Sequence, residues 1–67
     1  MNLKYEAGAD NGRNAAMIYL KSHTGRQVQD EIKRRQDADV SADDYALGYQ
    51  IAFIDTLMAR REYARNT

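Results

Sequence analysis

The sequence lacks cysteine, proline and tryptophan, and it contains one histidine. Without cysteine the chain has no disulfide and no thiolate metal ligand, and a single histidine excludes a histidine-rich metal site. The absence of proline, together with many Ala, Arg, Gln, Glu and Leu residues, favours helix. We therefore expect an all-α protein that holds no metal and no cofactor.

The chain also lacks an excess of either charge, because its 10 basic side chains balance its 10 acidic ones. Domains that bind nucleic acid through phosphates normally carry a basic surplus, so direct nucleic-acid binding is not expected. The longest apolar run, Ala15 to Leu20, is too short to span a membrane, and the N-terminus has no apolar signal-peptide core. The sequence predicts a cytoplasmic protein without a membrane partner.

Sixty-seven residues predict a single helical domain, 1–67. A chain this short buries only about 60% of the surface that it exposes when unfolded. Small domains therefore usually add a disulfide, a metal or a partner subunit to reach stability. With the first two excluded, we expect association between protein chains.

The helical pattern predicts two long helices in an antiparallel hairpin. The first is expected at about 10–37, with Asp10 or Asn11 as its N-cap. An N-terminal arm, 1–9, precedes it, and its alternating pattern also fits a short edge strand. If this helix begins earlier than expected, three small residues form a flat strip that permits close backbone approach: Gly8, Gly12 and Ala16. The alternative, which is commoner for such glycines, is that they mark a flexible start.

Gly25 decides whether the first helix is continuous. One apolar stripe crosses Gly25 without losing phase, and it consists of Met17, Leu20, Thr24, Val28 and Ile32. This continuity favours one long helix, bent near Gly25. The alternative is a break, because Thr24 followed three residues later by Gln27 is the capping-box pattern of a new helix start.

The second helix is expected at about 42–64, with Ser41 as its N-cap. Val40 and Tyr45 occupy the positions of a hydrophobic staple. Asp44 falls in the first turn, where negative charge suits the helix dipole. This is the most clearly delimited helix of the chain.

Apolar residues surround the second helix almost completely. The first stripe has the 4-3-4 spacing of a coiled-coil seam and is assigned to the hairpin core: Leu47, Ile51, Ile54 and Met58. The second stripe consists of Ala46, Phe53, Leu57 and Ala64, and the third of Tyr45, Tyr49, Ala52, Ala59 and Tyr63. Because the first helix is too polar to cover them all, we expect two hairpins to form a homodimeric four-helix arrangement.

Two surfaces of the second helix are candidates for a protein partner. The first combines three tyrosines with an arginine, residue types enriched at binding hot spots: Tyr45, Tyr49, Tyr63 and Arg60. The alternative for this face is that it closes the dimer edges. The second is an acidic stripe, which suits a basic surface such as the DNA-binding domain of a regulator: Asp44, Asp55 and Glu62. The alternative for the stripe is an ordinary solvated face.

The remaining polar residues predict no catalysis. No nucleophile lies in a pattern with histidine and an orienting acid, and no Gly-rich phosphate loop is present, so we do not expect an enzyme. The basic run Lys33–Arg34–Arg35 is flanked by acidic residues, and pairing at i,i+4 predicts a solvated face.

Two segments, NAAMIYLKSHTGRQVQDEIKRR and YALGYQIAFIDTLMARREYARN, together resemble the small quorum-sensing anti-activators of temperate Pseudomonas phages. The likeness extends over nearly the whole chain and rests on no diagnostic motif. It implies a helical homodimer that binds a host LuxR-type transcription activator and stops it from engaging DNA. It also implies contact with the pilus-assembly ATPase. It carries over no site residue.

Two other functions fit parts of the sequence. A small dimeric DNA-binding regulator is the main alternative, because NLKYEA followed by helices fits a ribbon-helix-helix fold. TGRQVQDEIKRR fits a helix-turn-helix segment, although neither has enough unpaired basic charge. A structural subunit of a phage particle is the other alternative.

Overall fold

The structure is a computed structural model that describes the backbone of residues 2–38 and 43–66 and the side chains of 2–38 and 43–60. Over these residues the chain forms three α-helices and no strand: α1 (Leu3–Ser22), α2 (Gly25–Asp37) and α3 (Asp44–Asn66). The predicted all-α class is confirmed. None of the described helices is long and apolar enough to cross a membrane.

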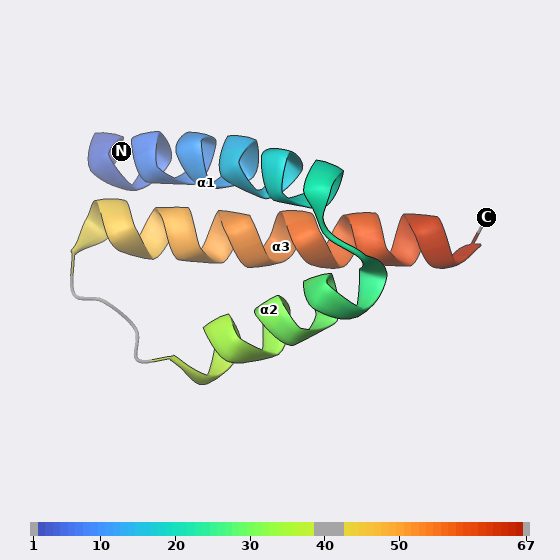
Figure 1. Ribbon diagram of the computed structural model, residues 1–67. Coiled ribbons are helices and arrows are strands. Elements are labelled where there is room, and N and C mark those ends of the chain that lie inside the picture. Colours follow the sequence, from blue (N-terminus) through green and yellow to red (C-terminus); the bar gives the residue numbers. More distant parts are fainter. Residues whose placement is uncertain (1, 39–42, 67) are drawn as a thin grey trace.

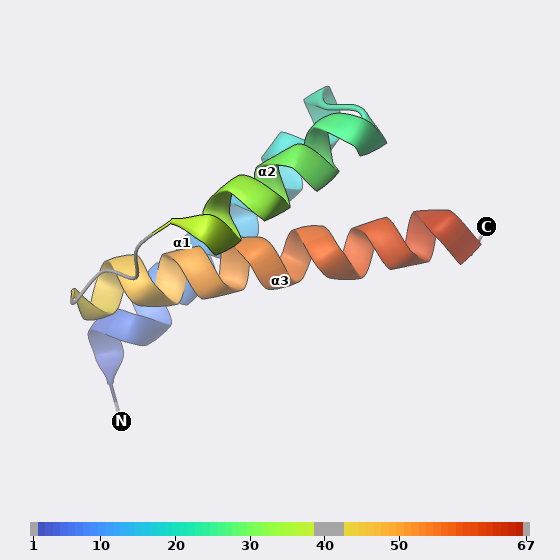
Figure 2. The ribbon, with the colours of Figure 1, turned by 90° about the horizontal axis from the view of Figure 1, so that it is seen from below.

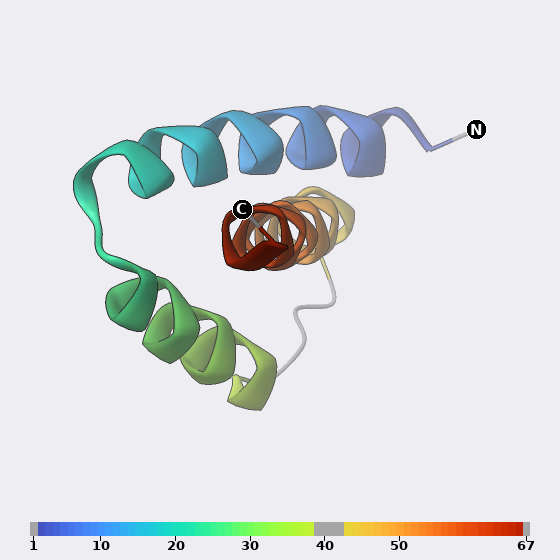
Figure 3. The ribbon, with the colours of Figure 1, turned by 90° about the vertical axis from the view of Figure 1, so that its right-hand side faces the viewer.

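Helix α3 is the central element of the fold. It runs in the same direction as α1, while α2 runs back between them in sequence (Figure 1). Seen along α3, the other two helices lie on different sides of it (Figure 3). The view from below shows that α2 diverges from α3 toward the C-terminal end of α3 (Figure 2). Residues in the first and last thirds of the sequence therefore form the main helix pair.

Helix α1 begins at Leu3, so the N-terminal arm predicted at 1–9 is wrong, and so is the edge strand. Asn2 caps the helix, because its side-chain oxygen accepts a hydrogen bond of 3.1 Å from the Tyr5 backbone N–H. Asp10, expected as an N-cap, lies inside the helix and forms an ion pair with Arg13. Asp10 and Asn11 suggested a helix start, but both lie inside α1, and the adjacent Gly12 packs against the Tyr49 backbone of α3.

The continuous first helix predicted through Gly25 is also wrong, and the alternative, a break, is correct. The Thr24 side chain accepts a hydrogen bond of 3.2 Å from the Gln27 backbone N–H, and the Thr24 N–H donates to Gln27 Oε1 at 2.9 Å. This reciprocal capping box starts α2. At the end of α1, His23 Nδ1 lies 2.7 Å from the Tyr19 carbonyl oxygen and helps to satisfy it.

The start of α3 differs by two residues from the sequence prediction. Asp43 caps the helix, since its Oδ2 accepts a hydrogen bond of 3.0 Å from the Ala46 N–H and its carbonyl accepts one of 2.9 Å from the Leu47 N–H. The predicted cap Ser41 and the staple residue Val40 lie outside the described residues.

Three glycines bring the backbones of α1 and α3 into direct contact. A Cβ added at Gly8 would lie less than 3.0 Å from the Tyr45 carbonyl oxygen, and one at Gly12 equally close to that of Tyr49. On the opposing helix, a Cβ at Gly48 would meet the Tyr5 carbonyl in the same way. The strip of small residues that the sequence offered is therefore used, and at Gly8 and Gly12 no side chain fits.

The apolar core lies where all three helices meet. Four residues predicted to be apolar core or interface are buried, namely Val28, Ile32, Phe53 and Leu57. Ala16 joins them in the same cluster, and Leu20, Ile54 and Met58 pack against it while half-buried. Met17, predicted as core, is 43% exposed. The break at His23 changes the phase between α1 and α2, and α1 turns its glycine face inward instead.

We predict that Gly12→Ala lowers the free energy of unfolding by about 1–3 kcal/mol, because the added methyl group forces two rigid backbones apart. Gly25→Ala is the matched control: nothing lies within 4 Å of a Cβ there. It should leave stability unchanged or raise it by up to about 1 kcal/mol. Urea unfolding followed by circular dichroism measures both, and equal effects would contradict the proposed close packing.

Candidate protein-binding surface

Helix α3 carries an apolar seam that the other helices leave partly open. The seam consists of Leu47, Ile51, Ile54 and Met58. Ile51 is 41% exposed, and the other three are half-buried. The sequence assigned these residues to the hairpin core, and for Ile51 this is wrong. The core uses the neighbouring stripe with Phe53 and Leu57 instead.

The geometry of the helix pair explains why the seam is open. Helix α1 approaches α3 along the backbone of Tyr45, Gly48 and Tyr49. Helix α2 lies against another face, where Val28 and Ile32 share the core with Leu57. Looking along α3, neither helix lies on its remaining side (Figure 3). The 41% exposure of Ile51 agrees with a position on this open side.

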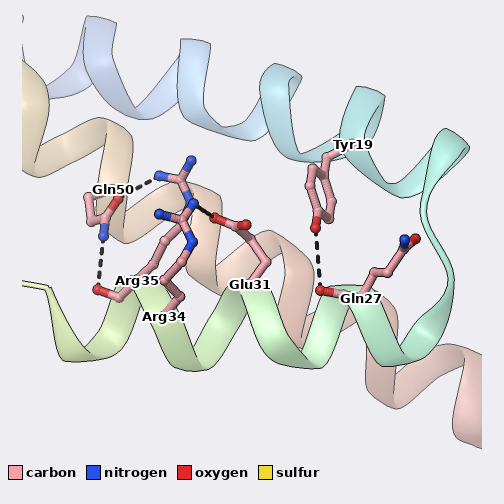
Figure 4. Close-up of polar contacts among 6 residues, drawn as sticks. All are labelled: Tyr19, Gln27, Glu31, Arg34, Arg35 and Gln50. Atoms are coloured by element: carbon pink, nitrogen blue, oxygen red, sulfur yellow. Dashed lines mark hydrogen bonds and ion pairs between the residues drawn. The ribbon is translucent and has the colours of Figure 1, made fainter.

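A polar cluster holds α2 in its place beside α3 (Figure 4). Arg35 Nη1 donates a hydrogen bond of 2.7 Å to Gln50 Oε1, and Gln50 Nε2 donates one of 2.9 Å to the Arg35 carbonyl oxygen. The Arg35 guanidinium also lies 4.0 Å from the centre of the Phe53 ring, as in a cation–π contact. These contacts fix one edge of the seam.

Glu31 completes this cluster from within α2. Its Oε1 accepts a hydrogen bond of 2.6 Å from Arg35 Nε and a second one from Arg34 Nη2. Burial raises the pKa of Glu31, but the hydrogen bonds and charges of Arg34 and Arg35 outweigh it, and the net pKa is lowered. The pairing predicted for the run Lys33–Arg34–Arg35 is correct, because both arginines pair with Glu31. The predicted solvation is wrong for Arg35, which is half-buried.

The tyrosine face predicted to bind a partner faces α1 in this structure. Tyr45 accepts a hydrogen bond from the Asn11 side chain through its hydroxyl, and its backbone lies against Gly8. Tyr49 is half-buried and stacks on Phe53 at 6.1 Å between ring centres. Arg60 is exposed, beside a shallow hollow that also involves Asp55. The side chain of Tyr63 lies outside the described part.

The acidic stripe remains available on the surface. Asp44 and Asp55 are both exposed and lie on α3, on the side where the seam is open. Glu62, the third predicted member, has a side chain outside the described part. The structure thus brings an apolar seam and two carboxylates together on one helix, which is the combination of apolar centre and charged rim found at protein interfaces.

The sequence prediction overlooked Tyr19, which joins the end of α1 to α2. Its ring stacks on His23 with 3.6 Å between centres, and its hydroxyl donates a hydrogen bond of 3.3 Å to the Gln27 carbonyl oxygen (Figure 4). Burial and the nearby negative charge of Glu31 raise the pKa of Tyr19. His23 is half-buried by this stack.

No group of three or more metal-binding side chains occurs among the residues that the structure describes. Comparisons of the chain with protein families, with curated proteins and with solved structures found no match.

The lowered pKa of Glu31 predicts a specific dependence of stability on pH. The ionised carboxylate stabilises the folded chain above the ordinary pKa of 4.5, and this contribution is lost as pH falls through the lower pKa of the folded state. Glu31→Gln should therefore show a shallower loss of unfolding free energy below pH 4.5 than the unmodified chain. Urea titrations at a series of pH values measure this, and identical slopes would disprove the coupling. Arg35→Gln removes an arginine partner of Glu31 and should also flatten the slope. Because both changes remove the same interaction, the double variant should show less than the sum of the two single effects.

Proposed function

We propose that this chain acts by binding proteins: it forms a homodimer through the open seam of α3 and inhibits a host transcription activator of the LuxR type. The observation that carries the proposal is the 41% exposure of Ile51, which is flanked on α3 by the half-buried apolar residues Leu47, Ile54 and Met58. An apolar residue exposed among apolar neighbours is a candidate centre for a protein contact.

The small size of the domain supports dimerisation. Because Ile51 is 41% exposed, covering the rest of each side chain contributes about 0.6–1.2 kcal/mol, and a two-fold pair covers it twice. A partner helix on the third side of α3 also supplies the stabiliser that a chain without disulfide or metal requires. The four-helix arrangement expected from the sequence becomes, in this proposal, a pair of three-helix units joined at α3.

The target is proposed from charge and from the resemblance to phage anti-activators. The DNA-binding domain of an activator presents basic side chains to phosphates. Asp44 and Asp55 present carboxylates from a rigid helix, and such charge complementarity speeds encounter and fixes orientation. A protein docked on those basic groups denies them to DNA. In this proposal the pilus-assembly ATPase is a second partner, suggested by the resemblance alone.

The dimer is tested by substitution at the seam. Ile51→Ser should raise the dimer dissociation constant by about tenfold to fiftyfold, because two partly exposed apolar side chains lose the burial that the dimer gives them. Ile18→Ser is the matched control, since Ile18 is 66% exposed on α1, away from the seam. Analytical ultracentrifugation over a range of concentrations measures both. A monomeric unmodified chain at micromolar concentration would refute the dimer.

The target is tested by competition with DNA. Adding this protein to a purified LuxR-type activator should remove the activator from its promoter fragment in a gel-shift titration. Asp55→Asn should raise the concentration needed for half-inhibition by about two- to fivefold, the range for one partly exposed ion pair. Asp30→Asn removes one exposed carboxylate from α2 and should leave inhibition unchanged. If the two variants behave alike, the acidic stripe is not the contact. Direct, salt-sensitive shifting of the DNA by this protein alone would favour the alternative regulator.

A further inference from the structure

Helix α2 is held less firmly than the other two helices. Its buried side chains are Val28 and Ile32, and it diverges from α3 along its length (Figure 2). Helices α1 and α3, by contrast, touch through backbone atoms at Gly8, Gly12 and Gly48. Segments with few buried apolar contacts open more easily than tightly packed ones. The packing therefore divides the described chain into a tight helix pair and one loosely held helix.

The connection between α1 and α2 provides a joint about which α2 can turn. His23 and Thr24 are both extended, with ψ angles of 147° and 165°, so the helical hydrogen bonds of α1 end before α2 begins. The cap of α2 is formed by Thr24 and Gln27, and a rotation about the His23 backbone leaves it intact. The hydrogen bond from the Tyr19 hydroxyl to the Gln27 carbonyl oxygen lies within one turn of this joint. At 3.3 Å it is long, so it tethers this end of α2 only weakly.

Arg35 fastens the other end of α2 to α3. Its guanidinium donates a hydrogen bond of 2.7 Å to Gln50 Oε1, and the Gln50 amide donates one of 2.9 Å to the Arg35 carbonyl oxygen (Figure 4). Glu31 orients the same guanidinium by accepting from its Nε at 2.6 Å, and the guanidinium lies 4.0 Å from the centre of the Phe53 ring. Hydrogen bonds to a charged group are stronger than neutral ones. One arginine thus joins a carboxylate of α2 to an amide and an aromatic ring of α3.

We propose that α2 is a releasable strap: it detaches from α3 by turning about the His23 joint while the α1–α3 pair stays packed, and Arg35 with Gln50 is the latch that sets how often it detaches. The remaining hydrogen bond from α2 to α3 among the described residues runs from the Gln36 amide to the Met58 sulfur at 3.8 Å, and sulfur is a weak acceptor. Detachment breaks the latch and uncovers the buried side chains of α2, but it breaks none of the glycine contacts. The strap is independent of the proposed dimer and of its target.

Amide hydrogen exchange of the unmodified chain tests whether α2 detaches separately. Corrected for intrinsic rates, the hydrogen-bonded amides of α2 should exchange at least about tenfold faster than those in the middle of α1 and α3, at residues 12–18 and 50–58. Two-dimensional NMR spectra recorded after transfer into heavy water resolve the individual amides. One common exchange rate in all three helices would overturn the proposal, because the chain would then open only as a whole.

Removal of the latch tests its role. Gln50→Ala should speed the exchange of α2 amides by about tenfold or more, because two hydrogen bonds are lost, and should change α1 by less than about twofold. Gln29→Ala is the matched control, since it makes the same substitution at an exposed position of α2 and should leave all rates within about twofold. Unchanged exchange of α2 in Gln50→Ala, or equal acceleration in all three helices, would overturn the latch. Loss of the helical circular dichroism signal in Gln50→Ala would count against it as well, because the α1–α3 pair should remain.

A double variant tests whether the two latch residues act together. Arg35→Lys keeps the positive charge but loses the planar group that reaches Glu31 and Gln50 at once, so it should also speed the exchange of α2. Arg35→Lys/Gln50→Ala should be at most about twofold faster than the faster single variant, because both changes remove the same contact. Accelerations that multiply in the double variant would show that Arg35 and Gln50 act separately, and the latch would be refuted.

Discussion

The direct contact between the backbones of α1 and α3 is the constraint on which the rest of the structure depends. Gly8 and Gly12 on one helix and Gly48 on the other leave room for no side chain between them. This contact occupies one face of α3 with backbone atoms and small residues, so the larger apolar side chains must lie on its other faces. The core with Phe53 and Leu57 forms on one of these. The open seam remains on the next.

Much of the fold follows from local sequence signals, but the packing of α1 does not. The period of Val28 and Ile32 predicted their burial, and the Thr24–Gln27 pattern contained the correct start of α2. The apolar stripe from Met17 to Ile32 was misleading, because the helical period relates the faces of residues only within one continuous helix, and the chain breaks between α1 and α2. The interior face of α1 is made of glycine and alanine, which hydrophobic periodicity does not detect. Only the opposing helix reveals why those small residues are needed.

For the candidate surface as well, the sequence identified the residues but not the neighbours that they face. All four seam residues were recognised from their spacing, yet a spacing does not state which of three apolar stripes faces which neighbour. The tyrosines were assigned to a partner, whereas Tyr45 and Tyr49 lie beside α1, whose start the sequence placed too late. One signal was overlooked. Arg35 lies three residues after Ile32 and continues the stripe of Val28 and Ile32, so its position beside Phe53 was accessible from the sequence.

The short helix α2 has a consequence for how the molecule opens. Its 13 residues bury only Val28 and Ile32, and its first turn is closed by its own capping box and joined to α1 by the hydrogen bond from the Tyr19 hydroxyl to the Gln27 carbonyl oxygen. The α1–α3 pair, by contrast, is joined by close glycine contacts in the N-terminal halves of both helices. Units of this kind detach separately in native proteins, with amide protons exchanging earliest in the least-buried one. Detachment of α2 would uncover Leu57, and the exposed apolar area of the central helix would then extend from Ile51 past Ile54 to a second face.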